Sequence, residues 1–248
     1  MNTRRKIILN DIKVLEMFLN CELGYPDEVF DKFLMLEGAK CYKHYDVTDT
    51  VYVPGKRKNR VLLVAHADTV FRVPGKHKVV LDDDDTYKRG SMDYGLGADD
   101  RAGCAILWLL KASGHSLLVT NDEEIGSLGA ANIRDNHKEL FEELNGHQYI
   151  LEFDRRHARD YKVYNIPVTD DFKSFIEDST GYTEADKYSS TDITRLCGKI
   201  CGANLSVGYY NEHYEDEYLV FSEWMNTLDV AREMLAGEQK RFPLKVSV

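Results

Sequence analysis

Three apolar segments of strand length alternate with segments of helical pattern, and this alternation constrains the fold more than any other feature. Residues 60–71, 115–126 and 147–157 each carry the near-continuous apolar run of a strand that is buried on both faces. Helical patterns occupy residues 97–114, 135–146, 168–181 and 221–237. Such alternation predicts an α/β fold, a three-layer sandwich with a mixed, largely parallel central sheet and helices on both faces.

Capping residues indicate where the terminal helices begin and end. Asn10 precedes an apolar pattern and is expected to cap a helix over residues 10–20. A second helix is expected over residues 25–38. In the last helix, Ser222 is expected to act as the cap and Gly237 as the stop.

The composition is that of a globular protein whose negative net charge opposes binding to polyanions. Of the 248 residues, 43% are hydrophobic and 30% are charged, and the formal net charge is −10. This charge opposes binding to nucleic acid and to an anionic membrane surface, and no apolar run has the length of a membrane span. Five cysteines without the spacing of a disulfide framework predict free thiols in a reducing, cytoplasmic compartment. The sequence leaves the oligomeric state open.

Two adjacent carboxylates, Asp99 and Asp100, directly precede the apolar helical run at residues 104–110. Charge at the mouth of a buried helix is costly unless a partner compensates it. On this stretch alone, a structural cap and a metal ligand are both consistent with the pattern.

Polar side chains follow the first two buried strands. His66 and Asp68 are separated by one residue, so an extended backbone places them on the same side, and a carboxylate commonly fixes the tautomer of a metal-bound imidazole. Glu123 and Glu124 come just past the second strand. Crowded carboxylates raise each other's pKa, and a cation that binds one of them leaves the other as a base. Neither pair is specific by itself, because exposed turn residues give the same pattern.

Asp154 follows the third strand, and His213 follows the last one. Individually, Asp154 suits a salt bridge to a neighbouring arginine, and His213 suits a surface position. Together with the earlier pairs, however, they give His, Asp, Glu-Glu, Asp and His in order at strand ends, the edge where open α/β sheets bind ligands. Imidazole and carboxylate donors without thiolate suit zinc or a similar divalent metal in a hydrolytic site.

Two other motifs are interpreted as structural. The run from Asp82 to Asp85 lies in a segment, residues 76–90, that is expected to form a surface hairpin or loop, where a solvated charge run is favoured over a cation site. Cys197 and Cys201 are interpreted as packing thiols, because their spacing matches neither a zinc ribbon nor a redox pair.

The segments "HADT", "GADDRAG", "DEEIG" and "EFD", followed by His213, resemble the zinc-dependent exopeptidase superfamily. That group contains peptidase T, carboxypeptidases, aminoacylases and co-catalytic di-zinc aminopeptidases. The resemblance implies two divalent metal ions, zinc with cobalt or manganese as alternatives. The implied roles are Asp99 as bridge between the ions, His66 and Asp154 at one ion, Glu124 and His213 at the other, Asp68 as the residue that orients His66, and Glu123 as the general base. Asp100 is expected to support the site, and Arg101 to brace the acids.

The implied activity is hydrolysis of an amide bond by a metal-dependent aminopeptidase or small-peptide exopeptidase acting on a small peptide. A deacylase of N-acyl amino acids is the alternative, because it would use the same site with a different pocket. A glutaminyl-cyclase-like protein or an inactive metal-binding relative is a third interpretation.

Many relatives carry a lid domain, but the intervals from Asp68 to Asp99 and from Asp154 to His213 are too short to hold one. Residues 1–248 are therefore expected to form a single catalytic domain with no lid or dimerisation domain. The oxyanion donor must then come from elsewhere. Candidates are a tyrosine within residues 208–214 and a polar residue within residues 189–193.

Overall fold

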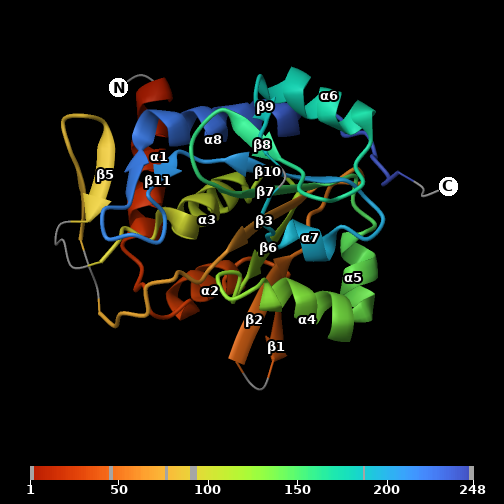
Figure 1. Ribbon diagram of the computed structural model, residues 1–248, viewed down its shortest axis with the longest axis horizontal. Coiled ribbons are helices and arrows are strands. Elements are labelled where there is room, and N and C mark those ends of the chain that lie inside the picture. The colour runs from red at the N-terminus through yellow and green to blue at the C-terminus, as the bar shows by residue number, and fades with distance from the viewer. Residues whose placement is uncertain (1–2, 45–46, 76–77, 90–93, 187, 246–248) are drawn as a thin grey trace.

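The computed structural model describes residues 3–44, 47–75, 78–89, 94–186 and 188–245. An eight-stranded sheet runs through its centre (Figure 1). In spatial order its strands are β1 (Lys40–His44), β2 (Val47–Val53), β6 (Ser116–Thr120), β3 (Leu62–His66), β7 (Ile150–Arg155), β10 (Gly202–Ser206), β8 (Asp160–Lys162) and β9 (Thr183–Glu184). Strands β6, β3, β7 and β10 run parallel, whereas β1, β2 and β8 join antiparallel. The predicted mixed, largely parallel sheet is therefore confirmed.

Helices cover both faces of this sheet, as the alternation of patterns predicts (Figure 1). One layer contains α1 (Thr3–Leu19), α2 (Asp27–Leu34), α3 (Ala98–Leu110), α6 (Asp170–Thr180) and α8 (Phe221–Ala236). The other contains α4 (Leu128–Asn136), α5 (Lys138–Leu144) and α7 (Ile193–Leu196). Within the fully buried strand β3, Leu63 belongs to the first hydrophobic cluster, and Leu62 and Val64 belong to the second. Successive side chains of a strand face opposite sides, so an all-apolar strand fills both cores.

A smaller antiparallel sheet lies beside the first core. Its order is β11 (Tyr209–Tyr210), β12 (Tyr218–Val220), β5 (Thr86–Arg89) and β4 (Val79–Leu81). Val79, Tyr87 and Leu219 from this sheet are buried in the same cluster as Leu63. The hairpin expected within residues 76–90 is thus present as β4 and β5.

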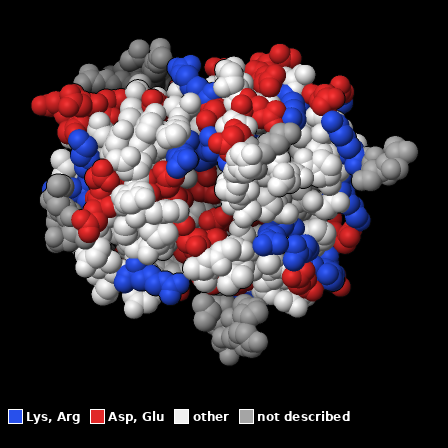
Figure 2. Space-filling model, in the orientation of Figure 1, with Lys and Arg blue, Asp and Glu red and all other residues white. Residues whose placement is uncertain are grey.

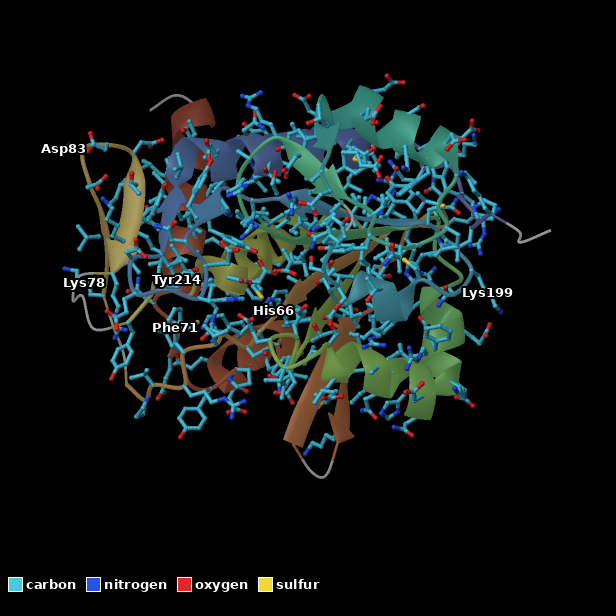
Figure 3. All side chains as sticks on the ribbon, viewed as in Figure 1. His66, Phe71, Lys78, Asp83, Lys199 and Tyr214 are labelled. Carbon is cyan, nitrogen blue, oxygen red and sulfur yellow. The ribbon has the colours of Figure 1, made fainter. Side chains whose placement is uncertain are left out.

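The aspartate run forms the turn of that hairpin and holds no catalytic group. Asp82 Oδ1 accepts hydrogen bonds from the backbone N–H groups of Asp84 and Thr86, and Asp85 Oδ2 accepts one from the N–H of Ser222 at 2.9 Å. Figure 3 shows Asp83 at the edge of the molecule, far from His66. The run therefore lies in the turn of the predicted hairpin, and its solvated character stays a prediction.

Two of the predicted helix caps are wrong. Helix α1 begins at Thr3, so Asn10 lies inside it, because the residues before Asn10 continue the helix. Helix α8 begins at Phe221, so Ser222 is its second residue. The N–H of Ser222 donates a hydrogen bond to the carboxylate of Asp85. Because Asp85 lies far away in the sequence, no local pattern could predict this contact. Gly237 follows the end of α8, as predicted.

No disulfide bond links cysteines within the described residues, and the two thiols of the "CGKIC" motif take part in packing. Cys201 is buried, and its Sγ donates to the carbonyl oxygen of Pro243. Cys197 packs against the second hydrophobic cluster. Among the helices in the described ranges, none combines the length and the apolar character that crossing a bilayer requires.

The two adjacent aspartates at the beginning of helix α3 have different structural roles. Asp99 and Asp100 have non-helical backbone angles, so the regular helix starts after them. Asp100 Oδ1 accepts a hydrogen bond from the N–H of Gly103 at 2.9 Å, the side-chain contact of an N-cap. Asp100 is therefore the structural cap, and Asp99 stands outside the helix.

Gly103 lets this capped end of α3 approach strand β7. A Cβ atom built on Gly103 would lie 2.1 Å from the carbonyl oxygen of Phe153 and 2.4 Å from Asp100 Oδ1. Backbone cannot move aside as a flexible side chain can, so any larger residue must push the helix away from the sheet.

Substitution Gly103→Ala is therefore expected to destabilise the fold by about 1–3 kcal/mol through overpacking. Urea unfolding followed by circular dichroism measures the change. Gly237→Ala is the matched control, because a Cβ there meets nothing within 4 Å. Equal midpoints for the two variants would contradict this account of the contact.

Candidate metal centre

The polar residues predicted from the strand ends meet at one edge of the sheet. His66 is the last residue of β3, Asp154 lies near the end of β7, and Glu123 and Glu124 follow β6. Since these three strands are parallel, their carboxyl ends share that edge. Asp99 comes from the non-helical beginning of α3. Figure 2 shows acidic side chains inside a hollow near the middle of the face, and Figure 3 places His66 there.

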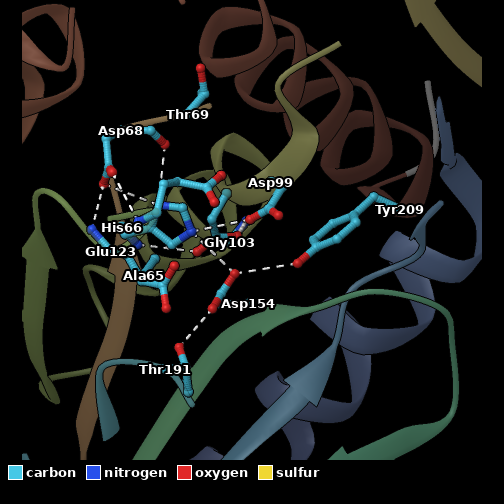
Figure 4. A network of polar contacts seen from close by, with 12 residues as sticks. Ala65, His66, Asp68, Thr69, Asp99, Gly103, Glu123, Asp154, Thr191 and Tyr209 are labelled. Atoms are coloured by element: carbon cyan, nitrogen blue, oxygen red, sulfur yellow. Dashed lines mark hydrogen bonds and ion pairs between the residues drawn. The ribbon is translucent and has the colours of Figure 1, made fainter. Parts of the chain in front are cut away.

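Asp99 lies between the two histidines and presents one carboxylate oxygen to each. Its Oδ1 is 3.1 Å from Nε2 of His66, and its Oδ2 is 3.2 Å from Nε2 of His213. Each imidazole also faces a second acid: Asp154 Oδ1 is 3.2 Å from His66, and Glu124 Oε2 is 3.0 Å from His213 (Figure 4 shows the His66 half). The geometry thus forms two donor sets that share Asp99.

His213 reaches this point by a different route from the one predicted. It lies in the turn between β11 and β12 of the smaller sheet, at a positive φ of 70°, and not at the end of a strand of the main sheet. The smaller sheet packs on the main core and carries His213 to the mouth of the hollow. His213 therefore lies beside the acids, as predicted, but the element that carries it is the smaller sheet and not the main one.

Asp68 holds His66 in one orientation and connects two loops. The Nδ1 atom of His66 lies 3.1 Å from the backbone oxygen of Asp68 and 3.3 Å from its Oδ1. Two oxygen neighbours favour a proton on Nδ1, which leaves Nε2 free to bind a cation. The Asp68 carboxylate also accepts hydrogen bonds from the N–H groups of Glu123 and Glu124, each at 3.2 Å.

The electrostatics of the site are those of crowded carboxylates. Burial, together with the charge of Asp154, raises the pKa of Glu123 to about 9. Burial likewise raises the pKa values of Glu124 and Asp154, again with Asp99 as a like charge nearby. For Asp99 itself, hydrogen bonds from His213 and His66 overcome burial and lower the pKa. Charges arranged in this way favour the presence of a cation.

The donor set fits a divalent metal. Ligand atoms of His66, Asp99 and Glu124 all lie within 4.8 Å of one another, as do those of His66, Asp100 and Asp154. Glu124 Oε1 is buried and has no hydrogen-bond partner among the described residues, so one lone pair remains available. Asp100 is the weaker candidate of the two aspartates, because its oxygens already accept from the N–H groups of His66 and Gly103.

Arg101 does not brace the acids, so this expectation is wrong. Its guanidinium is fully buried, and Nη2 donates to the backbone oxygens of Glu22 at 2.9 Å and Tyr25 at 3.5 Å. The side chain extends from the start of α3 toward the loop between α1 and α2. Arg101 therefore supports that loop. The packing of α1 on α3 brings the loop within reach of its side chain.

Glu217 is a supporting residue that sequence reasoning missed. Its Oε2 accepts from the N–H of Gly97 at 2.6 Å and its Oε1 from the N–H of Asp99 at 3.0 Å, so it holds the loop that carries Asp99. Burial raises its pKa to about 8, although these backbone donors oppose the shift. In the sequence, Glu217 is one acid in the run "YEDEY", and nothing distinguishes it from its exposed neighbour Glu215.

A cavity of about 250 Å³ opens over the acids. Of the candidate oxyanion donors, Tyr209 lines it, with its hydroxyl 3.3 Å from Asp154 Oδ1. The hydroxyl of Tyr210 donates instead to Glu223. Thr191 lines the cavity too, but its hydroxyl is placed between Asp154 Oδ2 at 2.9 Å and Glu152 Oε1 at 3.0 Å. Ser189 and Ser190, also within the predicted segment, line the cavity as well.

No protein-family model matches the chain, and no curated protein matches it. Solved structures do share its fold. Aminopeptidase PepT from Bacillus cereus is 13% identical with a TM-score of 0.69, over 91% of this chain and 97% of that one. A tripeptidase from Staphylococcus aureus is 13% identical with a TM-score of 0.65, over 91% and 97%. The TET1 peptidase of Pyrococcus horikoshii is 13% identical with a TM-score of 0.61, over 92% and 99%.

Substitution Glu217→Gln is expected to weaken the binding of a divalent cation, with zinc as the probe, by about tenfold to a hundredfold, because one backbone N–H near Asp99 would face an amide NH₂ group in place of a carboxylate oxygen. Competition with a chromophoric chelator measures the dissociation constant, and circular dichroism checks the fold. Glu215→Gln serves as the exposed control. Equal zinc affinity in the two variants would show that Glu217 does not position Asp99.

Proposed function

We propose that this chain belongs to the zinc-dependent exopeptidase superfamily and hydrolyses amide bonds as a metal-dependent aminopeptidase or small-peptide exopeptidase. The observation that carries the proposal is the placement of Asp99, with one oxygen toward His66 and the other toward His213, each imidazole facing its own second acid. The shared fold with an aminopeptidase, a tripeptidase and a TET1 peptidase supports it.

Two divalent ions are the proposed cofactors. His66, Asp99 and Asp154 would hold one ion, and Asp99, Glu124 and His213 would hold the other. Bound there, the ions would lower the pKa of water and polarise the substrate carbonyl. Nitrogen and oxygen donors suit zinc, and they also suit cobalt or manganese.

Glu123 is the proposed general base. It lines the cavity beside Asp99 and Glu124, and Ser127 Oγ lies 3.4 Å from its Oε1. In this role Glu123 takes a proton from the water that attacks the substrate carbonyl and delivers it to the leaving amine. Asp68 would act as a positioning residue, because it binds His66 and the backbone of Glu123 at once.

The domain organisation and the cellular location are part of the same proposal. Residues 1–248 would form one catalytic domain, which is supported by the single hydrophobic cluster that joins the smaller sheet to the main one. A reducing, cytoplasmic location is supported by the lack of disulfide bonds among the described residues. The substrate would be a small peptide. A deacylase of N-acyl amino acids would use the same residues, and comparing free with N-acylated dipeptides separates the two activities.

Substitution Glu123→Gln is expected to lower kcat for dipeptide hydrolysis by about 10²–10⁴ while metal content stays unchanged, because the amide cannot accept the proton. Glu124→Gln is the neighbouring comparison and is expected to lose metal as well as activity. Amine release and elemental analysis measure both quantities. A Glu123→Gln enzyme that keeps the full rate would overturn the proposed base.

Chelation is expected to abolish hydrolysis, and zinc, cobalt or manganese is expected to restore it. Elemental analysis of the active protein should find two ions per chain, since the donor atoms form two sets around Asp99. One ion per chain would instead favour the cyclase-like interpretation, and activity that survives complete removal of metal would exclude a metallopeptidase.

A further inference from the structure

We propose that a second cavity beside the catalytic residues is a subsite for an apolar side chain next to the scissile amide bond, so that the enzyme prefers peptides with an apolar residue on that side. This inference rests on the function proposed above. The cavity measures about 470 Å³, within the usual size of small-molecule sites. Glu124 lines both this cavity and the one over the acids, and Asp68 also lines it. The two cavities therefore adjoin at Glu124.

The apolar wall of this subsite is one part of a lining that also includes Asp68, Thr69, Arg72, Asn121, Asp122 and Glu124. Tyr25 is 55% exposed, Val70 is 36% exposed and Ile125 is 50% exposed, and all three line the same cavity. They come from the α1–α2 loop, the loop after β3 and the loop after β6. When a ligand covers exposed apolar surface beside a catalytic cluster, the burial of that surface lowers the free energy of the complex.

The loops that carry this wall are tied to one another. The N–H of Gly24 donates to the carbonyl oxygen of Val73 at 3.0 Å, and Thr69 Oγ1 donates to the carbonyl oxygen of Leu23 at 3.1 Å. The buried guanidinium of Arg101 anchors the α1–α2 loop from below through Glu22. Such a wall is preformed, so a ligand would not have to order it.

The cavity over the acids has a different character. Besides the metal-site residues it is lined by Arg155, Arg156 and Lys162. Each of these cations is paired: with Asp160, with Glu212 and with Asp186, respectively. That cavity suits the main chain and polar groups of a substrate. Selection for an apolar side chain is therefore assigned to the second cavity, because Tyr25, Val70 and Ile125 line it beside its charged residues.

The test uses Val70→Ser and Ile125→Ser, which remove apolar contacts from the wall. Two matched controls change the same residue types at similarly exposed positions elsewhere: Val80→Ser, where Val80 is 47% exposed on β4, and Ile7→Ser, where Ile7 is 48% exposed on α1. The substrates are the dipeptides Leu-Gly, Gly-Leu, Ser-Gly and Gly-Ser. They vary the side chain on either side of the scissile bond.

At one of the two positions, the wild-type protein is expected to favour leucine over serine. The wall variants should lose about tenfold in kcat/KM for that leucine substrate, through KM, and keep their rate on the serine substrates. The controls should behave as the wild type. Equal loss on leucine and serine substrates, or no loss at all, would overturn the subsite.

Binding of the same dipeptides, measured by calorimetry with Glu123→Gln as the background, separates this inference from the proposed function. Leucine-dependent affinity that weakens about tenfold in the wall variants supports the subsite even if the wild-type protein hydrolyses none of these peptides. In that event the proposed function fails and the subsite stands. If the wild-type protein hydrolyses these peptides and the wall variants keep its preference between leucine and serine, the proposed function stands and the subsite fails.

Discussion

Crowding of carboxylates around two imidazoles at the edge of the sheet is the constraint on which the rest of the structure depends. Burial and mutual repulsion raise the pKa values of Glu123, Glu124 and Asp154, so these groups cannot all stay ionised without a compensating charge. Asp99 occupies the centre, because each of its oxygens faces one histidine. Small displacements of Asp99 would alter both donor sets at once.

The surrounding residues fix Asp99 and His66 largely through the backbone. Asp100 caps α3 and accepts from the N–H of His66, and Glu217 accepts from the N–H of Asp99. Asp68 joins His66 to the loop of Glu123. Acidic residues thus serve two purposes here, since some face the reaction site while others hold its loops. Supporting groups of this kind orient ligands and tune a metal site as strongly as the ligands do.

The polar residues of the site could be predicted from the sequence, because the carboxyl ends of parallel strands lie at one edge of the sheet. His66, Glu123, Glu124 and Asp154 each follow an apolar run, and a sheet of such strands has to bring them together. Long-range partners were not readable. Asp85 caps α8 in place of Ser222, and Arg101 turns away from the acids toward Glu22, because in each case the partner lies far away in the sequence.

The sequence by itself determined the layered α/β fold, the buried central strands and the set of polar residues at their ends, since hydrophobic periodicity and strand length are local properties of a chain. The tertiary structure decided how the two adjacent aspartates are held. Asp100 became the cap because Gly103 offers its N–H, and Asp99 was left between His66 and His213. It also decided that His213 arrives on the smaller sheet and that Glu217 is buried beneath the Asp99 loop. The positions of Asp99, His213 and Glu217 depend on contacts between segments far apart in the chain, which no local pattern of residues contains.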